Sequence, residues 1–257
     1  MNTFSLKNKK IFVLGGSGLI GKPTIKLLID HGAKIFNLDI LNTNQEKIKF
    51  IKFDLKNTKN IKPNFKKIVK KFGCPDVFVN CSYPVTNNWS KANFSEIDLS
   101  NINNNLKIHL SSFVWISSLV AEEMKKEKIK GSIIQLASIY GIVAQNLNLY
   151  KNTSMRENFV YPLIKSAIIS NCRQMASYYG KYNIRVNSIS PGAILGHVKN
   201  KEKKQSSTFI ENFKRINPIK RLANPNEISP AIVFLASDAS SYITGTNIVI
   251  DGGWTII

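Results

Sequence analysis

The chain has 257 residues, a formal net charge of +20 and three cysteines. A chain of this length can bury the core of one α/β domain, so we expect a single domain over residues 1–257. Cys74, Cys81 and Cys172 are too scattered for a disulfide framework or a metal site, and no apolar run is long enough to cross a bilayer. The N-terminal segment lacks a signal-peptide core, so we expect a cytoplasmic protein without a metal or a membrane contact.

The positive charge is spread along the chain rather than gathered in one basic block, and it alternates with many asparagines. Nucleic-acid binding needs clustered lysines and arginines that neutralise a phosphate backbone. We therefore expect no nucleic-acid partner, whereas a general attraction of anionic substrates fits the charge.

The first expected strand is the apolar run 11–14, and a helix is expected from about Leu19 to His31, ended by Gly32. The loop between them is rich in glycine, so its backbone can approach a pyrophosphate while the helix N-terminus offers free N–H groups. An ordinary glycine turn is the alternative interpretation. The residues expected to bind a dinucleotide here are Gly15, Ser17, Gly18, Leu19, Ile20 and Gly21.

A second expected strand, 34–38, ends at Asp39, near the distance at which a dinucleotide fold places an acid on the adenosine ribose. A carboxylate there accepts hydrogen bonds from the ribose hydroxyls and repels a 2′-phosphate. No arginine lies in the glycine loop or directly after Asp39. The pattern predicts NAD rather than NADP, and a solvated aspartate at a strand end is the alternative.

Tyr161 and Lys165 lie four residues apart, a spacing that places both side chains on one face of a helix. A nearby cation favours the phenolate, so we expect Lys165 to bring the Tyr161 pKa towards that of a useful acid or base. Pro162 is compatible with the first turn of that helix. The spacing is common by chance, and it gains meaning here from the glycine loop upstream.

With these features, the chain resembles the short-chain dehydrogenase/reductase family over essentially its whole length. The resemblance implies a single Rossmann-type domain with a doubly wound parallel sheet of about seven strands and helices on both faces. The alternation of strands and helical stretches along the chain indicates the same α/β class. The ending, 235–253, is similar to the family's C-terminal signature.

The resemblance also implies further cofactor-binding residues. Segment 53–55 is similar to the part of the family that contacts adenine, and 184–192 resembles the strand and Pro-Gly turn beside the nicotinamide. Segment 80–83 stands where the family has Asn-Asn-Ala-Gly, and only its first residue is kept. The residues implied are Asp54, Leu55, Asn80, Tyr161, Lys165, Pro191, Gly192 and Ile194.

The implied catalytic set is Ser138, Tyr161 and Lys165, and one position departs from the family. His109 aligns with the asparagine that usually completes the tetrad and holds a proton-relaying water. A histidine can donate and accept hydrogen bonds, so His109 could carry this relay. A histidine that only packs against its neighbours is the alternative.

Two segments are expected near the substrate. The distance from Ser138 to Tyr161 implies an insertion of roughly ten residues within 144–160, which should overhang the cleft. The run 199–207 is rich in serine and lysine and is expected to be a mobile segment that closes over substrate, as this region does in the family.

Several strings are similar to oxidoreductases of the flagellin modification protein A type, which belong to pathways for nonulosonate and other surface glycans. They are 80–84, 109–110, 138–144 and 150–153. This narrower resemblance implies NAD-dependent hydride transfer at a hydroxyl or carbonyl carbon of an anionic sugar derivative, such as a sugar phosphate or nucleotide sugar. Family members usually form homodimers or homotetramers, and the same is expected here.

Two alternatives remain open. A 3-oxoacyl-carrier-protein reductase shares the catalytic residues and suits the positive charge, but it usually prefers NADPH, against which Asp39 argues. A catalytically silent NAD-binding regulator would fit the altered segment 80–83 and His109, whereas the intact Ser138, Tyr161 and Lys165 favour an enzyme.

Overall fold

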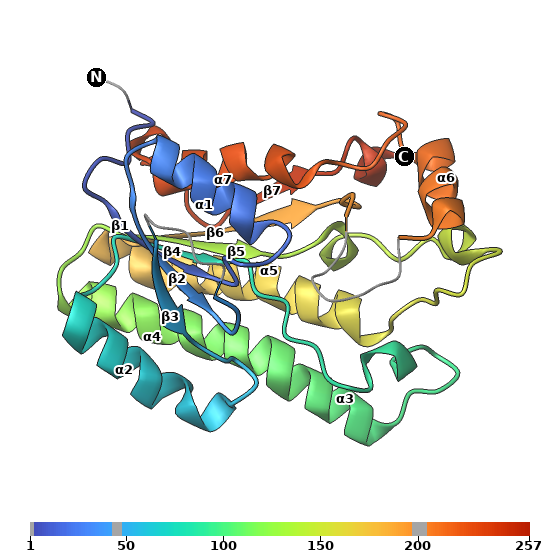
Figure 1. Ribbon diagram of the computed structural model, residues 1–257, viewed down its shortest axis with the longest axis horizontal. Coiled ribbons are helices and arrows are strands. Elements are labelled where there is room, and N and C mark those ends of the chain that lie inside the picture. The colour runs from blue at the N-terminus through green and yellow to red at the C-terminus, as the bar shows by residue number, and fades with distance from the viewer. Residues whose placement is uncertain (1–2, 43–47, 197–204) are drawn as a thin grey trace.

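A computed structural model describes residues 3–42, 48–196 and 205–257. In these residues one sheet of seven parallel strands has the order β3-β2-β1-β4-β5-β6-β7 (Figure 1). The strands are β1 Lys10–Leu14, β2 Lys34–Asp39, β3 Lys49–Lys52, β4 Val77–Asn80, β5 Ser132–Leu136, β6 Arg185–Pro191 and β7 Asn247–Ile250. The expected doubly wound α/β fold is confirmed.

Helices join the strands on both faces of the sheet. The α-helices are α1 Gly21–Asp30, α2 Ile61–Phe72, α3 Leu99–Asn105, α4 Ser112–Lys126, α5 Val160–Tyr179, α6 Ser207–Ile216 and α7 Ser229–Ala236. A π-helical turn, η3 Leu106–Ser111, joins α3 to α4. Short 3-10 turns include η2 Trp89–Lys91, η4 Ile139–Gly141, η5 Leu147–Tyr150 and η8 Asp238–Ser240.

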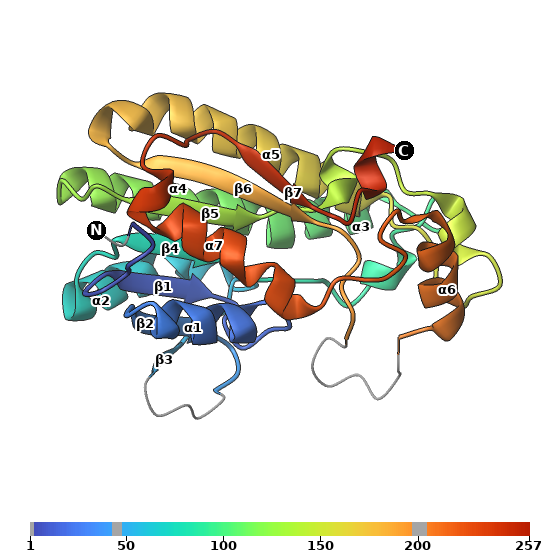
Figure 2. The same cartoon turned by 90° about the horizontal axis from the view of Figure 1, so that it is seen from above.

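Side chains of β1 alternate between two cores, as the period of a strand requires. Phe12 and Leu14 pack with α2, α4 and α5, whereas Ile11 and Val13 pack with α1 and α7. Figure 2 shows these two helical layers on opposite sides of the sheet. A strand that is buried on both faces has apolar residues at consecutive positions. This explains why apolar and polar residues do not alternate in segment 11–14.

The strand order reverses between β1 and β4, since β2 and β3 lie on one side of β1 and β4 to β7 on the other. In open α/β sheets, ligands bind beyond the carboxyl ends of the strands at such a switch point. The glycine loop follows β1 directly, and Asn80 ends β4. The topology therefore directs both segments to the edge where a ligand is expected.

Two sequence expectations need correction at element ends. The first helix spans Gly21–Asp30 rather than 19–31, because residues 15–20 form a turn in which the Gly18 N–H donates to the Gly15 carbonyl at 3.1 Å. Of the expected mobile run 199–207, positions 199–204 lie outside the described residues. Ser206 and Ser207 belong to ordered structure, because Ser206 Oγ accepts from the Phe209 N–H and caps α6.

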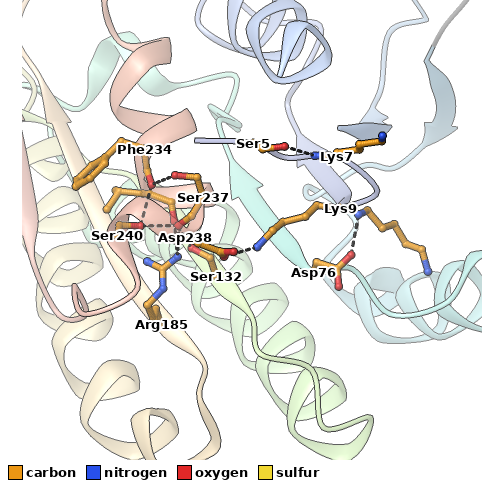
Figure 3. Close-up of polar contacts among 12 residues, drawn as sticks. Ser5, Lys7, Lys9, Asp76, Ser132, Arg185, Phe234, Ser237, Asp238 and Ser240 are labelled. Atoms are coloured by element: carbon orange, nitrogen blue, oxygen red, sulfur yellow. Dashed lines mark hydrogen bonds and ion pairs between the residues drawn. The ribbon is translucent and has the colours of Figure 1, made fainter. Parts of the chain in front are cut away.

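The amino ends of the strands carry a polar network of their own (Figure 3). The Arg185 guanidinium donates to the carbonyls of Leu235, Ser237 and Ile243 at 2.8, 3.3 and 3.3 Å. Lys9 Nζ lies 2.7 Å from Asp238 Oδ1. These contacts hold β6 and the N-terminal segment against the end of α7, and three of the Arg185 hydrogen bonds go to backbone oxygens.

Candidate active site

The glycine loop packs so tightly that side chains are excluded at two of its positions. A Cβ on Gly15 would lie 2.6 Å from Ser82 Cα, and φ is +76° there, in the left-handed region that favours glycine. A Cβ on Gly21 would lie 2.6 Å from Gly16 Cα. At Gly18 a Cβ would meet only the Gly15 carbonyl oxygen, at 3.1 Å. Gly15 and Gly21 thus serve the packing of the turn, whereas Gly18 is the least crowded of the three.

Asp39 ends β2 and is almost fully buried beside this loop. Its Oδ2 accepts from the Ser17 N–H at 2.8 Å, and its Oδ1 accepts from the Leu41 N–H at 3.0 Å. Ser17 Oγ donates to the Leu41 carbonyl at 2.6 Å and accepts from Asn37 Nδ2 at 3.0 Å. The carboxylate is therefore fixed in position, and its remaining lone pairs can accept hydrogen bonds from a ligand.

The other loop residues of the predicted set lie around the same edge. Ile20 precedes α1 and packs against the core under it. The Leu19 side chain lies against Gly196, where an added Cβ would be 2.9 Å from Leu19 Cδ1. Leu19 thereby links the glycine loop to the segment that follows β6.

Asn80 is fully buried at the end of β4. Its Oδ1 accepts from the Ser82 N–H at 3.2 Å and from Ser82 Oγ at 2.6 Å, but its Nδ2 has no partner among the described residues. Buried amide groups are nearly always hydrogen-bonded, so this donor is available to a ligand that reaches the edge.

Asp54 and Leu55 are placed differently from each other. Asp54 is exposed and accepts from the Lys56 N–H at 2.9 Å, whereas the Leu55 side chain is buried in the core that α2 and α4 cover. Only the backbone of Leu55 is therefore left to contact an adenine.

Pro191, Gly192 and Ile194 lie at the carboxyl end of β6. The Gly192 N–H donates to the Ile250 carbonyl at 2.9 Å, and the Ile194 carbonyl accepts from Gln205 Nε2 at 3.2 Å. The Pro-Gly turn is thus held against β7, and the carbonyl of Ile194 already serves the chain's own structure.

Ser138, Tyr161 and Lys165 meet at the carboxyl end of β5. Ser138 follows β5 and caps η4, while Tyr161 is the second residue of α5 and Lys165 lies one turn later. Lys165 Nζ lies 5.5 Å from the centre of the Tyr161 ring and donates to the Leu136 carbonyl at 2.9 Å. The start of α5 is set by Asn158, whose Oδ1 accepts from the Tyr161 N–H at 2.8 Å.

Burial acts on both titratable groups of this set. It raises the pKa of Tyr161 to about 12, which Ser138 partly offsets as a hydrogen-bonding neighbour. Burial lowers the pKa of Lys165 to about 7. The expectation that Lys165 lowers the pKa of Tyr161 was wrong: the loss of water on burial raises this pKa, and Lys165 is not among the groups that shift it.

His109 lies in the π-helical turn η3 and is fully buried. Its ring contacts the rings of Tyr83, Trp89 and Phe113, and neither of its nitrogens has a partner among the described residues. Burial, followed by the charge of Lys165, holds its pKa well below the usual range, so the ring is neutral. Asn105, by contrast, is satisfied by Thr86 and Asn101.

Three aromatic rings that sequence reasoning did not assign surround Tyr161. Those of Tyr83, Trp89 and Tyr140 lie edge-on to it, with centroids 5.9, 6.0 and 6.3 Å away. Tyr83 stands in the altered segment 80–83, where the family has glycine, and this departure was the signal that could have identified it. The neighbourhood of Tyr161 is thus walled by aromatic side chains.

The described residues contain no group of three metal-ligating side chains, and none of their helices is long and apolar enough to cross a membrane. A cavity of about 710 Å³ opens at the opposite, amino edge, lined in part by Lys9, Asp76 and Arg185. Its size does not make it the reaction site, because the groups suited to acid–base chemistry lie at the carboxyl edge.

Comparison with known proteins shows the family of the chain. The family model described as enoyl-(acyl carrier protein) reductase matches residues 19–255. Post-translational flagellin modification protein A of Campylobacter coli is 31% identical over 261 residues, which cover 97% of this chain and 99% of that protein.

Two solved structures bind a nicotinamide dinucleotide. A short chain dehydrogenase from Leptospira borgpetersenii serovar Hardjo-bovis, with bound NAD+, has a TM-score of 0.85 and 29% identity, covering 98% of this chain and 95% of that one. A 4-hydroxyisoleucine dehydrogenase complexed with NADH has a TM-score of 0.80 and 29% identity, covering 97% of this chain and 100% of that one.

Proposed function

The chain belongs to the short-chain dehydrogenase/reductase family, and from this premise we propose that it is an NAD-dependent enzyme acting on a sugar derivative. Its reaction moves a hydride between the nicotinamide and a hydroxyl or carbonyl carbon. The observation that carries this proposal is the meeting of Ser138, Tyr161 and Lys165 beside the glycine loop and Asp39.

The residues present fit a dinucleotide. Gly18 is less crowded than Gly15 and Gly21, the buried Asn80 Nδ2 is unpaired among the described residues, and the fixed Asp39 carboxylate retains lone pairs. NAD would therefore be held by residues 15–21, Asp39 and Asn80, with Asp54 and segment 191–194 at its two ends. When bound, NAD supplies the hydride acceptor. The carboxylate of Asp39 favours ribose hydroxyls over a 2′-phosphate, which supports NAD over NADP.

The chain's own residues would handle the proton. Ser138 Oγ would hold the substrate oxygen, and Tyr161 Oη would give that oxygen a proton or take one from it. Burial keeps the Tyr161 phenol protonated, so the form present in the folded chain is the proton donor needed when NADH reduces a carbonyl, and oxidation with NAD would need the phenolate. A charged Lys165, 5.5 Å from the Tyr161 ring centre, would stabilise the phenolate left after donation.

His109 would serve as the relay that the family's asparagine usually provides. A neutral imidazole has one donor and one acceptor, and both nitrogens of His109 lack a partner among the described residues. Lys165 Nζ and the His109 ring both lie against the Phe113 ring, at 5.4 and 5.2 Å from its centre, and a water between them would complete the relay.

A substrate from surface-glycan biosynthesis is supported by the similarity to flagellin modification protein A. The rings of Tyr83, Trp89 and Tyr140 offer an apolar surface to the C–H face of a sugar ring, and the net charge of +20 attracts anionic sugars. We also propose that the protein is cytoplasmic and forms a homodimer or homotetramer, as other family members do.

The test is NADH formation by the purified protein with NAD and a panel of hexosamine phosphates, nucleotide sugars and simple polyols. One sugar class should be oxidised, and Tyr161→Phe should lower kcat by about 10²–10⁴-fold while NADH binding is retained. Rates in Tyr161→Phe equal to those of the wild type would refute the assignment. NADH binding without turnover in either direction would favour a silent regulator, and activity only with acyl thioesters would favour the carrier-protein reductase.

A further inference from the structure

The residues directly before α5 include an asparagine that uses both ends of its side-chain amide. Asn158 Oδ1 accepts from the Tyr161 N–H at 2.8 Å, and Asn158 Nδ2 donates to the Trp89 carbonyl at 3.1 Å. A backbone N–H can only donate and a carbonyl can only accept, so these partners fix the orientation of the amide. The Asn158 N–H donates to Gln145 Oε1 at 2.9 Å. Asn158 is therefore held by both its backbone and its side chain.

The segment that contains Asn158 lies along the loop that follows β4. The Phe159 N–H donates to the Ala92 carbonyl at 2.6 Å, and the Phe94 N–H donates to Glu157 Oε1 at 3.2 Å. The rings of Phe94 and Phe159 meet edge-on, 4.9 Å apart centre to centre. The hydrogen bonds of Asn158 thus belong to a larger contact between two loops.

Each end of the Asn158 amide reaches a residue whose side chain lies at the proposed reaction site. Tyr161 lies in the first turn of α5 and provides the phenol. The Trp89 ring lies edge-on to the Tyr161 ring, with centroids 6.0 Å apart, and 5.9 Å from the His109 ring. One side-chain amide therefore joins the residue that handles the proton to an aromatic residue beside it.

We propose that Asn158 is a positioning residue that holds Trp89 beside the Tyr161 hydroxyl, so that the Trp89 ring selects substrates by the apolar face of a ring. An apolar ring face packs on an aromatic side chain, while Tyr161 Oη must reach the oxygen of the reacting carbon. Both conditions are met together only if the two side chains keep their spacing. The substrate class that follows is a cyclic alcohol or the cyclic ketone formed from it. This inference rests on the proposed dehydrogenase function.

The test compares the reduction of cyclohexanone and of acetone by NADH in the wild type and in Asn158→Ser. Serine can still accept from the Tyr161 N–H, as it does at the start of many helices, but it lacks the amide nitrogen that donates to Trp89. We expect the KM for cyclohexanone to rise about tenfold, as for the loss of one hydrogen bond, with kcat changed less than about twofold. The preference for cyclohexanone over acetone should fall by the same factor as KM rises.

Two further variants separate the two ends of the amide. Asn158→Ala removes both hydrogen bonds, so kcat for both ketones should fall about tenfold as well, because Tyr161 loses its fixed position. Asn103→Ser makes the serine change at an exposed position of α3 and should leave kcat and KM unchanged. If Asn158→Ala fails to fold, the split between KM and kcat in Asn158→Ser still tests the role of Asn158.

A double-mutant cycle shows whether Asn158 acts through Trp89. Trp89→Leu should itself lower the preference for cyclohexanone about tenfold, and adding Asn158→Ser should lower it less than about twofold further. Effects of the two substitutions that multiply independently would overturn the role of Asn158. An unchanged KM in Asn158→Ser, or an unchanged preference in Trp89→Leu, would do the same.

The proposed function and this inference fail in different ways. A wild type that turns over a member of the sugar panel but does not prefer cyclohexanone to acetone would overturn the selection by Trp89 and leave the dehydrogenase function in place. A wild type that reduces neither ketone and turns over no member of the sugar panel would overturn the proposed function itself.

Discussion

The two edges of the sheet are both rich in polar groups, yet in the described part of the chain no unpaired buried side-chain group lies at the amino edge. Such groups lie at the carboxyl edge and, as Asn37 Oδ1 and Gln135 Oε1, within β2 and β5. At the amino edge, the Arg185 guanidinium is satisfied by three carbonyls, and Asp76 accepts from the Lys10 N–H at 2.7 Å. At the carboxyl edge, Asn80 Nδ2 and both nitrogens of His109 have no partner among the described residues.

This difference indicates that the polar network at the amino edge stabilises the fold, whereas the polar groups at the carboxyl edge can bind a ligand. Unpaired buried groups cost about 1–3 kcal/mol each, so a ligand that pairs with those at the carboxyl edge would offset this cost. The amino edge has the cavity of about 710 Å³, but the carboxyl edge has the incomplete hydrogen bonds. The state of the hydrogen bonds is therefore a better guide to function than cavity size.

The largest change in stability is expected for a substitution at the amino edge. Arg185→Met removes three charge-assisted hydrogen bonds to the carbonyls of Leu235, Ser237 and Ile243. Each carbonyl keeps one neutral donor, which is Ser132 Oγ, Ser240 Oγ or Asn187 Nδ2 respectively. We expect the free energy of unfolding in urea to fall by about 3 kcal/mol.

Binding of NADH to the folded variant should be unchanged, because the substitution lies at the opposite edge from the glycine loop. Lys9→Ala is the control, since its partner Asp238 is exposed and the loss should stay below about 1 kcal/mol. A stable Arg185→Met protein with impaired NADH binding would show that the amino edge serves cofactor binding rather than stability, which contradicts the account.

A smaller effect follows from Lys165 at the carboxyl edge. Its folded-state pKa of about 7 lies below the ordinary 10.5, so between these values the unfolded chain binds the proton and the folded chain does not. Stability contributed by this site therefore rises with pH across that window. Relative to Lys165→Met, the wild type should gain about 2 kcal/mol of unfolding free energy from pH 7 to pH 9.

Unfolding of both proteins in urea at the two pH values measures this gain. Lys66→Met, at an exposed lysine of α2, should show no such pH-dependent difference from the wild type. A constant difference between wild type and Lys165→Met would mean that Lys165 is charged throughout.

The smallest effect concerns the choice of cofactor. Asp39→Asn keeps the shape of the side chain but removes the negative charge beside the ribose position. The ratio of NADPH to NADH dissociation constants, measured by tryptophan fluorescence, should fall about tenfold, equivalent to about 1.4 kcal/mol. Asp30→Asn, at the exposed far end of α1, is the matched control. An unaltered ratio would show that the charge of Asp39 does not select NADH over NADPH.

Features that depend on local pattern were predictable from the sequence. The glycine turn, Asp39 at a strand end and the Tyr161–Lys165 spacing each lie within one short segment, and the structure places them at one edge. The family resemblance supplied Ser138 and His109. Even the start of α1 was misplaced only by the two residues that the turn uses.

Features that depend on tertiary packing could not be predicted. Tyr83 and Tyr140 come from loops after two different strands, β4 and β5, and no pattern along the chain says that their rings lie beside that of Tyr161. The direction of the Tyr161 pKa was mispredicted for the same reason, since it is set by burial, which depends on tertiary packing.

Hydrogen–deuterium exchange with and without NADH tests the central claim most directly. The claim is that the cofactor binds at the carboxyl edge of the sheet, where buried polar groups lack partners. We predict slower exchange in residues 15–22, 80–83 and 191–194 on adding NADH, with no change in residues 236–244 at the amino edge. Protection confined to the amino edge, or no protection at the glycine loop at saturating NADH, would contradict the account.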